Sequence, residues 1–174
     1  MPTTTDTAPR IYVASLSDYN AGRLHGAWID ATQEPDEIHE EVAAMLAKSR
    51  EMIAEEWAIH DYEGFAGLSI HEWEQFEKVS ELAQLIEEHG AAYAAYAEHV
   101  GVDCADAEGF RDAYCGEWDS EKAYAENYAE ETGAWTEDNP LAFYVDWDKY
   151  ARDMFMTSHY SVSASPGIYV FWTI

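Results

Sequence analysis

The chain has 174 residues, of which 35 are acidic and 9 are basic, so its formal net charge is −26 although 48% of its residues are hydrophobic. Its 7 Trp, 12 Tyr and 6 Phe residues argue against an acidic disordered chain, because such chains are poor in aromatic residues. The sequence has no basic patch, which excludes nucleic acids and anionic membranes as partners and favours a basic protein surface.

The N-terminal third predicts strands and one helix. Residues 10–16 and 27–30 have the composition of two short strands, and the polar, glycine-bearing segment between them predicts an antiparallel pair. Pro35 is expected to begin a helix, because proline is favoured at the first helical position. The apolar stripe expected on this helix is Ile38, Val42, Met45, Leu46 and Ile53. Residues 56–62 alternate as a third strand would.

The middle of the chain predicts helices separated by glycines. The longest spans residues 70–89, where apolar side chains recur every three or four residues and leave the glutamates outward. Shorter helices are expected to end at Gly101, Gly116 and near Gly133, followed by one over residues 141–156. A C-terminal hairpin with a Pro-Gly turn then completes an α+β fold with strand pairs at both ends and a helical middle.

No motif predicts an enzyme, a metal site or a cofactor. HEWEQ at His71 is not the HExxH zinc motif, and DCADAEG from Asp103 resembles a calcium loop but no glutamate closes the pattern. Cys104 and Cys115 follow no signal peptide, and no apolar run is long enough to span a membrane. We therefore expect reduced thiols in a cytoplasmic protein.

The charge itself is the most informative feature. Residues 116–131, GEWDSEKAYAENYAEE, carry six carboxylates and one lysine. Carboxylates three or four residues apart on a helix stand about 5–6 Å apart, and duplex DNA carries one phosphate per about 1.7 Å of axis. The 35 acids of the chain correspond to about 17 base pairs of phosphate charge, and its net charge corresponds to about 13. Such a row of carboxylates can replace phosphates.

Several segments in the same order resemble one family, the ArdA antirestriction proteins. They are IYVASLSDYNAGRLHGAWIDA, EWAIHDYEGF, FRDAYCGEWDS, YVDWDKYARDMFM and the final IYVF. The resemblance runs from about Arg10 almost to the C-terminus. It implies a DNA mimic, encoded on mobile genetic elements, that occupies the DNA-binding groove of type I restriction-modification enzymes.

The resemblance also implies an organisation. Members are elongated homodimers whose chains have three small α+β modules, which here predicts an N-terminal module at residues 1–62, a central helical module at 63–102 and a C-terminal module at 103–174. The family binds through a distributed acidic surface and is not enzymatic. The methylase core of a type I enzyme is therefore the expected partner.

The residues predicted to form the DNA-mimic surface come from the central helix and from the acidic run. They are Glu72, Glu74, Glu77, Glu81, Glu87, Glu88, Glu117, Asp119, Glu121, Glu126, Glu130 and Glu131. Two alternatives remain open. One is an acidic adaptor or chaperone for another basic protein, and the other is a halophile-adapted small domain, although glutamate outnumbers aspartate 22 to 13.

Overall fold

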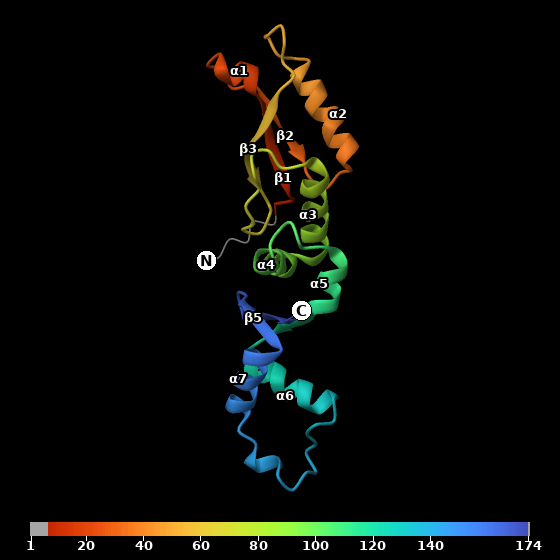
Figure 1. Cartoon of the computed structure of the whole chain (residues 1–174), viewed down its shortest axis with the longest axis vertical. Helices are drawn as coiled ribbons and strands as arrows, with labels where there is room; N and C mark the ends of the chain where they lie inside the picture. The colour runs from red at the N-terminus through yellow and green to blue at the C-terminus, as the bar shows by residue number, and fades with distance from the viewer. Residues whose placement is uncertain (1–6, 174) are drawn as a thin grey trace. The chain divides into compact units, whose positions relative to one another are not determined.

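Two three-stranded antiparallel sheets, one in each half of the chain, confirm the predicted α+β class with strands at both ends. The computed structural model describes residues 7–173. Its contacts divide the chain into two compact units, Met1–Ala94 and Ala95–Ile174, and Figure 1 shows the elements of each. The division falls within helix α4 (Ala91–Val100). The three-module organisation stays a prediction.

The sheet of the N-terminal unit is built around its first strand. β1 (Arg10–Ser15) lies between β2 (Gly26–Asp30) and β3 (Trp57–Glu63), in the order β2-β1-β3. Ile11 pairs with Ile29 on one side and with Tyr62 on the other. Because β1 is the central strand, its alternate apolar side chains are fully buried, and it forms the centre of this unit's core.

Two helices pack in the N-terminal unit. α2 (Pro35–Leu46) and α3 (Phe76–His89) bury their apolar faces, and the Trp57 ring of β3 stacks on Phe76 at 4.3 Å between centroids. The predicted stripe of α2 is correct at Ile38, Val42 and Met45 but wrong at Ile53. That residue is 72% exposed because the helix ends at Leu46, seven residues before it.

The polar connection between β1 and β2 contains a short helix that the sequence did not predict, α1 (Leu16–Asn20). The side chain of Ser15 caps it by accepting a hydrogen bond from the backbone N–H of Asp18. Asp18 is itself buried, and the Ser49 hydroxyl donates to its carboxylate at 2.5 Å. This hydrogen bond is the main reason that the pKa of Asp18 is lowered. The connection is therefore an ordered part of the fold.

The C-terminal unit has a sheet of order β4-β6-β5. The predicted hairpin is confirmed as β5 (His159–Ser163) and β6 (Ile168–Trp172). The third strand, β4 (Tyr114–Trp118), corrects the predicted helix to Gly116. Helix α5 (Ala107–Ala113) ends earlier because residue 114 adopts an extended conformation and pairs with β6.

Helices α6 (Glu121–Glu131) and α7 (Trp147–Thr157) cover this sheet. Between them lies a loop with one 3-10 turn, η1 (Ala142–Tyr144), where the sequence predicted a continuous helix. α7 begins only after Asp146, whose side chain caps it. The core formed by these elements contains Tyr124, Ala125, Ala151, Met154 and Val170.

Candidate functional site: a carboxylate surface

The predicted DNA-mimic surface is accessible throughout. None of its twelve residues is buried, and only four of them are half-buried: Glu74, Glu81, Glu121 and Glu126. The other eight are exposed. We call this set the carboxylate surface and keep the name below. Its side chains are therefore accessible and contribute little to the core.

In the N-terminal unit, four members of the carboxylate surface lie on α3: Glu77, Glu81, Glu87 and Glu88. The prediction was wrong in placing Glu72 and Glu74 on the same helix, because α3 begins at Phe76 with Gln75 as its N-cap residue. The backbone N–H of Ile59 in β3 donates to the carbonyl of Glu72 at 2.9 Å. Strand β3 thus holds this segment outside the helix.

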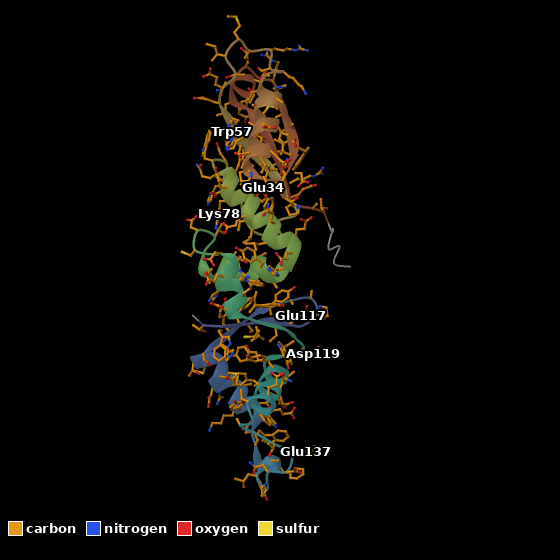
Figure 2. All side chains as sticks on the ribbon, turned by 90° about the vertical axis from the view of Figure 1, so that its right-hand side faces the viewer. Glu34, Trp57, Lys78, Glu117, Asp119 and Glu137 are labelled. Atoms are coloured by element: carbon orange, nitrogen blue, oxygen red, sulfur yellow. The ribbon has the colours of Figure 1, made fainter. Side chains whose placement is uncertain are left out.

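In the C-terminal unit, the acidic run passes from a strand into a helix. Glu117 lies on β4, Asp119 lies in the turn that follows, and the remaining members lie on α6 (Figure 2). Ser120 caps α6 by accepting from the backbone N–H of Ala123. Glu121 also has a structural role, since the Ser161 hydroxyl donates to its carboxylate at 2.8 Å.

Few basic groups neutralise the carboxylate surface. Within residues 7–173, only Glu81 and Glu88 of its members form ion pairs, with Lys78 at 3.0 Å and with the imidazole of His89 at 3.8 Å. Most of the other paired bases contact acids outside the set, in the pairs Arg10–Glu63, Arg23–Glu51, Arg23–Asp18, Lys122–Asp148 and Arg152–Asp153. The surface therefore keeps most of its negative charge.

Both units carry an excess of negative charge. Residues 1–94 contain 19 acids and 5 bases, for a net charge of −14, and residues 95–174 contain 16 acids and 4 bases, for −12. Sequence reasoning left out other acids that the structure also shows exposed: Asp36, Glu37, Glu40 and Glu41 of α2, and Glu137 and Asp138 of the loop after α6. The i,i+3 and i,i+4 spacing within α2 was the signal that could have found the first four.

The shifted pKa values belong mostly to the interior of the protein. Burial raises the pKa of Tyr160 to about 12, raises the pKa of Tyr124 and lowers the pKa of His159. In the part of the chain that the structure describes, no three His, Cys, Asp or Glu side chains gather where they could hold a metal ion. Nor does any helix of residues 7–173 have the length and apolar character to cross a membrane.

The fold and this surface define a class: a small α+β protein that presents accessible, largely unpaired carboxylates on both of its units. The family model for the antirestriction protein ArdA matches residues 11–168. The chain therefore belongs to the ArdA family of antirestriction proteins, and the resemblance seen in its motifs is confirmed. No curated protein matches the sequence significantly.

Proposed function

We propose that this protein is a DNA mimic that occupies the DNA-binding groove of a type I restriction-modification enzyme and thereby inhibits it. The observation that carries the proposal is the carboxylate surface, whose members are exposed or half-buried in both units and form only two ion pairs within residues 7–173. A groove that binds DNA is lined by Lys and Arg side chains. Exposed carboxylates can take the place of phosphates there.

The proposed mechanism requires binding alone. A negative field over both units steers the protein toward a positive groove and accelerates association. Once the protein is bound, the basic side chains that would contact phosphates contact carboxylates, and DNA cannot enter. The proposal includes a cytoplasmic homodimer that acts on the methylase core, with no catalytic step and no nucleic acid bound by the protein itself.

Competition for the methylase core tests this function. A fluorescently labelled duplex is bound to a type I methylase, and the protein is added while anisotropy is followed. We expect displacement with an apparent dissociation constant for DNA that rises in proportion to the protein concentration. Duplexes with and without the recognition sequence should both be displaced, because phosphate contacts carry no base-edge information.

A matched control is a variant with Glu117, Glu126, Glu130 and Glu131 changed to Gln and Asp119 changed to Asn, which keeps side-chain size and removes charge. It should displace DNA poorly at the same concentration. Ternary complexes in which DNA stays bound would contradict mimicry and favour an acidic adaptor for another basic protein. Stability only in molar salt would favour the halophile-adapted domain.

A further inference from the structure

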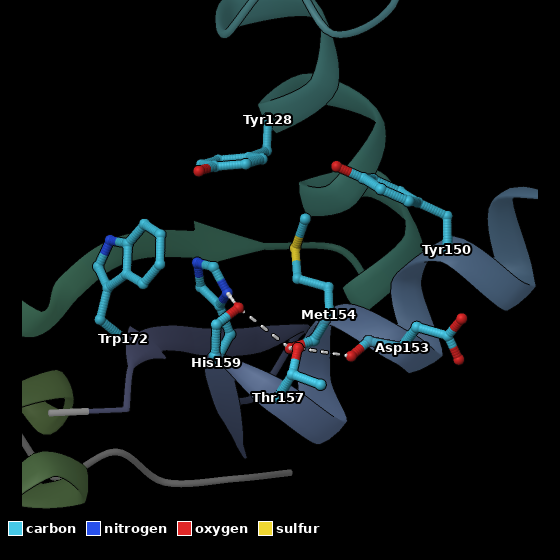
Figure 3. A pocket seen from close by; sticks show the side chains of 8 residues that line it. Tyr128, Tyr150, Asp153, Met154, Thr157, His159 and Trp172 are labelled. Carbon is cyan, nitrogen blue, oxygen red and sulfur yellow. Dashed lines mark hydrogen bonds between the residues drawn. The ribbon is translucent and has the colours of Figure 1, made fainter.

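The C-terminal unit contains a hollow of about 370 Å³ that the carboxylate surface does not include. Its opening lies between helices α6 and α7 and the end of β6 (Figure 3). The lining residues are Tyr128, Tyr150, Asp153, Met154, Thr157, Ser158, His159 and Trp172. We call it the aromatic hollow.

Three separate elements supply its aromatic walls. Tyr128 comes from α6, Tyr150 from α7 and Trp172 from β6. The rings of Tyr128 and Trp172 meet at 72° with centroids 5.9 Å apart, and Trp172 remains 37% exposed. Figure 3 shows the three rings with the side chains of Met154 and His159 projecting between them. Since the fold fixes these elements, the walls of the hollow are formed before a ligand binds.

His159 forms the floor as a neutral ring. Its Nε2 is hydrogen-bonded to the Tyr124 hydroxyl and its Nδ1 to the Ser158 hydroxyl, both at 2.9 Å. The imidazole also packs on Trp172 with centroids 3.9 Å apart. Burial lowers the pKa of His159, so at neutral pH the ring adds no positive charge. Because both nitrogens already have hydrogen-bond partners, a ligand can contact only the ring surface of His159.

The electrostatics of the hollow favour a cation. No Lys or Arg is among its lining residues, and the unit around it has a net charge of −12. The carboxylate of Asp153 points away from the rings in Figure 3 and lies 3.9 Å from Arg152, so the rings and the charge of the unit carry this preference. The faces of aromatic rings are negative because of their quadrupole. A cation within about 6 Å of such a face gains about 0.5–1 kcal/mol at exposed sites and more when it is desolvated.

We propose that the aromatic hollow receives the cationic side chain of a Lys or Arg residue of the bound protein partner. The methylene stem of such a side chain suits Met154, while its charged end can lie against the ring faces of the walls. This inference rests on the proposed function, because a DNA-binding groove supplies Lys and Arg side chains. It adds one shaped contact to a surface otherwise made of dispersed charges.

The first test uses the full-length protein with amino-acid probes. Trp side chains are labelled with ¹⁵N, and the indole N–H signal of Trp172 is identified by its loss in Trp172→Phe. N-acetyl-arginine amide and N-acetyl-lysine amide are titrated, with N-acetyl-citrulline amide as the uncharged counterpart of arginine. Trp73, which is exposed between Glu72 and Glu74, reports general attraction to acidic surface.

We expect the Trp172 signal to shift and saturate with both cations, to respond at least fivefold more weakly to citrulline, and to move well before that of Trp73. Equal responses to arginine and citrulline would show a neutral apolar site and overturn the proposal. A linear shift of Trp172 that matches Trp73 would also overturn it. Because no restriction enzyme is present, this arm does not depend on the proposed function.

The second test measures affinity for a type I methylase. Tyr150→Leu and Tyr128→Leu each remove one aromatic wall. The matched control is Tyr19→Leu, an exposed tyrosine of the N-terminal unit. Each hollow variant should weaken binding by about two- to fivefold, the equivalent of one exposed cation–π contact, and Tyr19→Leu should not weaken it.

The two proposals can fail separately. If the methylase binds the wild-type protein and both hollow variants equally well, with melting temperatures unchanged, this inference is wrong and the DNA-mimic proposal stands. If the methylase does not bind the wild-type protein at all, the DNA-mimic proposal is wrong. The probe titration then decides whether the hollow takes cations.

Discussion

The Tyr124 hydroxyl and the Nε2 atom of His159 lie 2.9 Å apart inside the C-terminal unit, where both side chains are buried. They join α6 to the first residue of β5. Both groups have pKa values shifted toward their neutral forms by burial, upward for Tyr124 and downward for His159. The contact is therefore a hydrogen bond between neutral groups, and protonation of His159 opposes the folded state.

This relationship predicts an acid-sensitive fold. An unperturbed histidine has a pKa of about 6.5, and the folded protein binds this proton only at lower pH. The neutral imidazole therefore contributes fully to the free energy of unfolding above the pKa of the unfolded state. This contribution is lost as the pH falls toward the lower pKa of the folded state, at a rate of at most about 1.4 kcal/mol per pH unit for one proton. The melting temperature should fall between pH 7.5 and 5.5, a range in which most carboxylates stay ionised.

The comparison with His159→Gln isolates this residue. The glutamine of this variant does not titrate, so the variant's melting temperature should start lower at pH 7.5 and change less down to pH 5.5, as followed by circular dichroism. His39 is exposed, and His39→Gln serves as the control that should keep the wild-type slope. Identical slopes for the wild type and His159→Gln would show that the buried imidazole does not govern the acid sensitivity.

Salt is predicted to act in opposite directions on the fold and on binding. A net charge of −26 makes like charges repel within each unit, and added ions screen that repulsion. Melting temperature should therefore rise from low to moderate salt. Binding to a basic groove should weaken over the same range, because the Debye length falls to about 10 Å near 0.1 M. Parallel melting and affinity measurements check this, and a salt-independent affinity would exclude an electrostatic mechanism.

Recognition through the carboxylate surface is predicted to be distributed. Glu130 is exposed on α6 and forms no ion pair within residues 7–173. Glu130→Gln alone should therefore change the Kd for the methylase by less than about fivefold, the equivalent of about 1 kcal/mol. Replacing Glu117, Asp119, Glu126, Glu130 and Glu131 together should weaken it by much more than any single change. Loss of all binding from Glu130→Gln, with folding intact, would instead identify a focused hot spot.

Glu121 should behave differently from its neighbours. Its carboxylate accepts a hydrogen bond from the Ser161 hydroxyl, and this bond links α6 to β5. Glu121→Gln retains an acceptor and should leave the melting temperature nearly unchanged, whereas Glu121→Ala removes the contact and should lower stability by about 1 kcal/mol. Thermal melts of both variants check this. Equal effects of the two substitutions would show that the hydrogen bond contributes nothing measurable.

Periodicity predicted those elements whose own residues specify them. Ile38, Val42 and Met45 of the α2 stripe follow from local spacing, the β5–β6 hairpin follows from strong β-forming residues, and both are confirmed. Strand β4 could not be predicted in the same way, since YCGEW has a glycine at its centre and no alternating pattern. It forms because β6 offers pairing partners, Tyr114 opposite Phe171 among them. Strand β6 lies more than fifty residues further along the chain, so the residues around β4 do not indicate this pairing.

The candidate sites show the same limit. Charge and helical spacing were enough to identify exposed carboxylates such as Glu77 and Glu130, because a charged side chain on a helix rarely enters the core. The aromatic hollow was not predicted. Tyr128, Tyr150 and Trp172 look like core residues in sequence, and only the packing of α6, α7 and β6 shows that their rings surround open space.

The last prediction concerns the homodimer and the surface that forms it. Leu141, Phe143 and Tyr144 lie at η1 and are 66%, 96% and 83% exposed. Large apolar side chains at such exposure add little to the core, and aromatic residues are enriched in protein interfaces. We predict that η1 belongs to the dimer contact, with a light-scattering mass near twice 19.7 kDa.

Phe143→Ser with Tyr144→Ser should shift the mass toward the monomer and leave the secondary structure unchanged. The matched control is Met52→Ser with Ile53→Ser, at another exposed apolar site, where the side chains are 99% and 72% exposed. If the control pair dissociates the dimer and the η1 pair does not, the contact lies in the N-terminal unit instead. A wild-type protein that is monomeric at micromolar concentration and still inhibits would show that one chain suffices for inhibition.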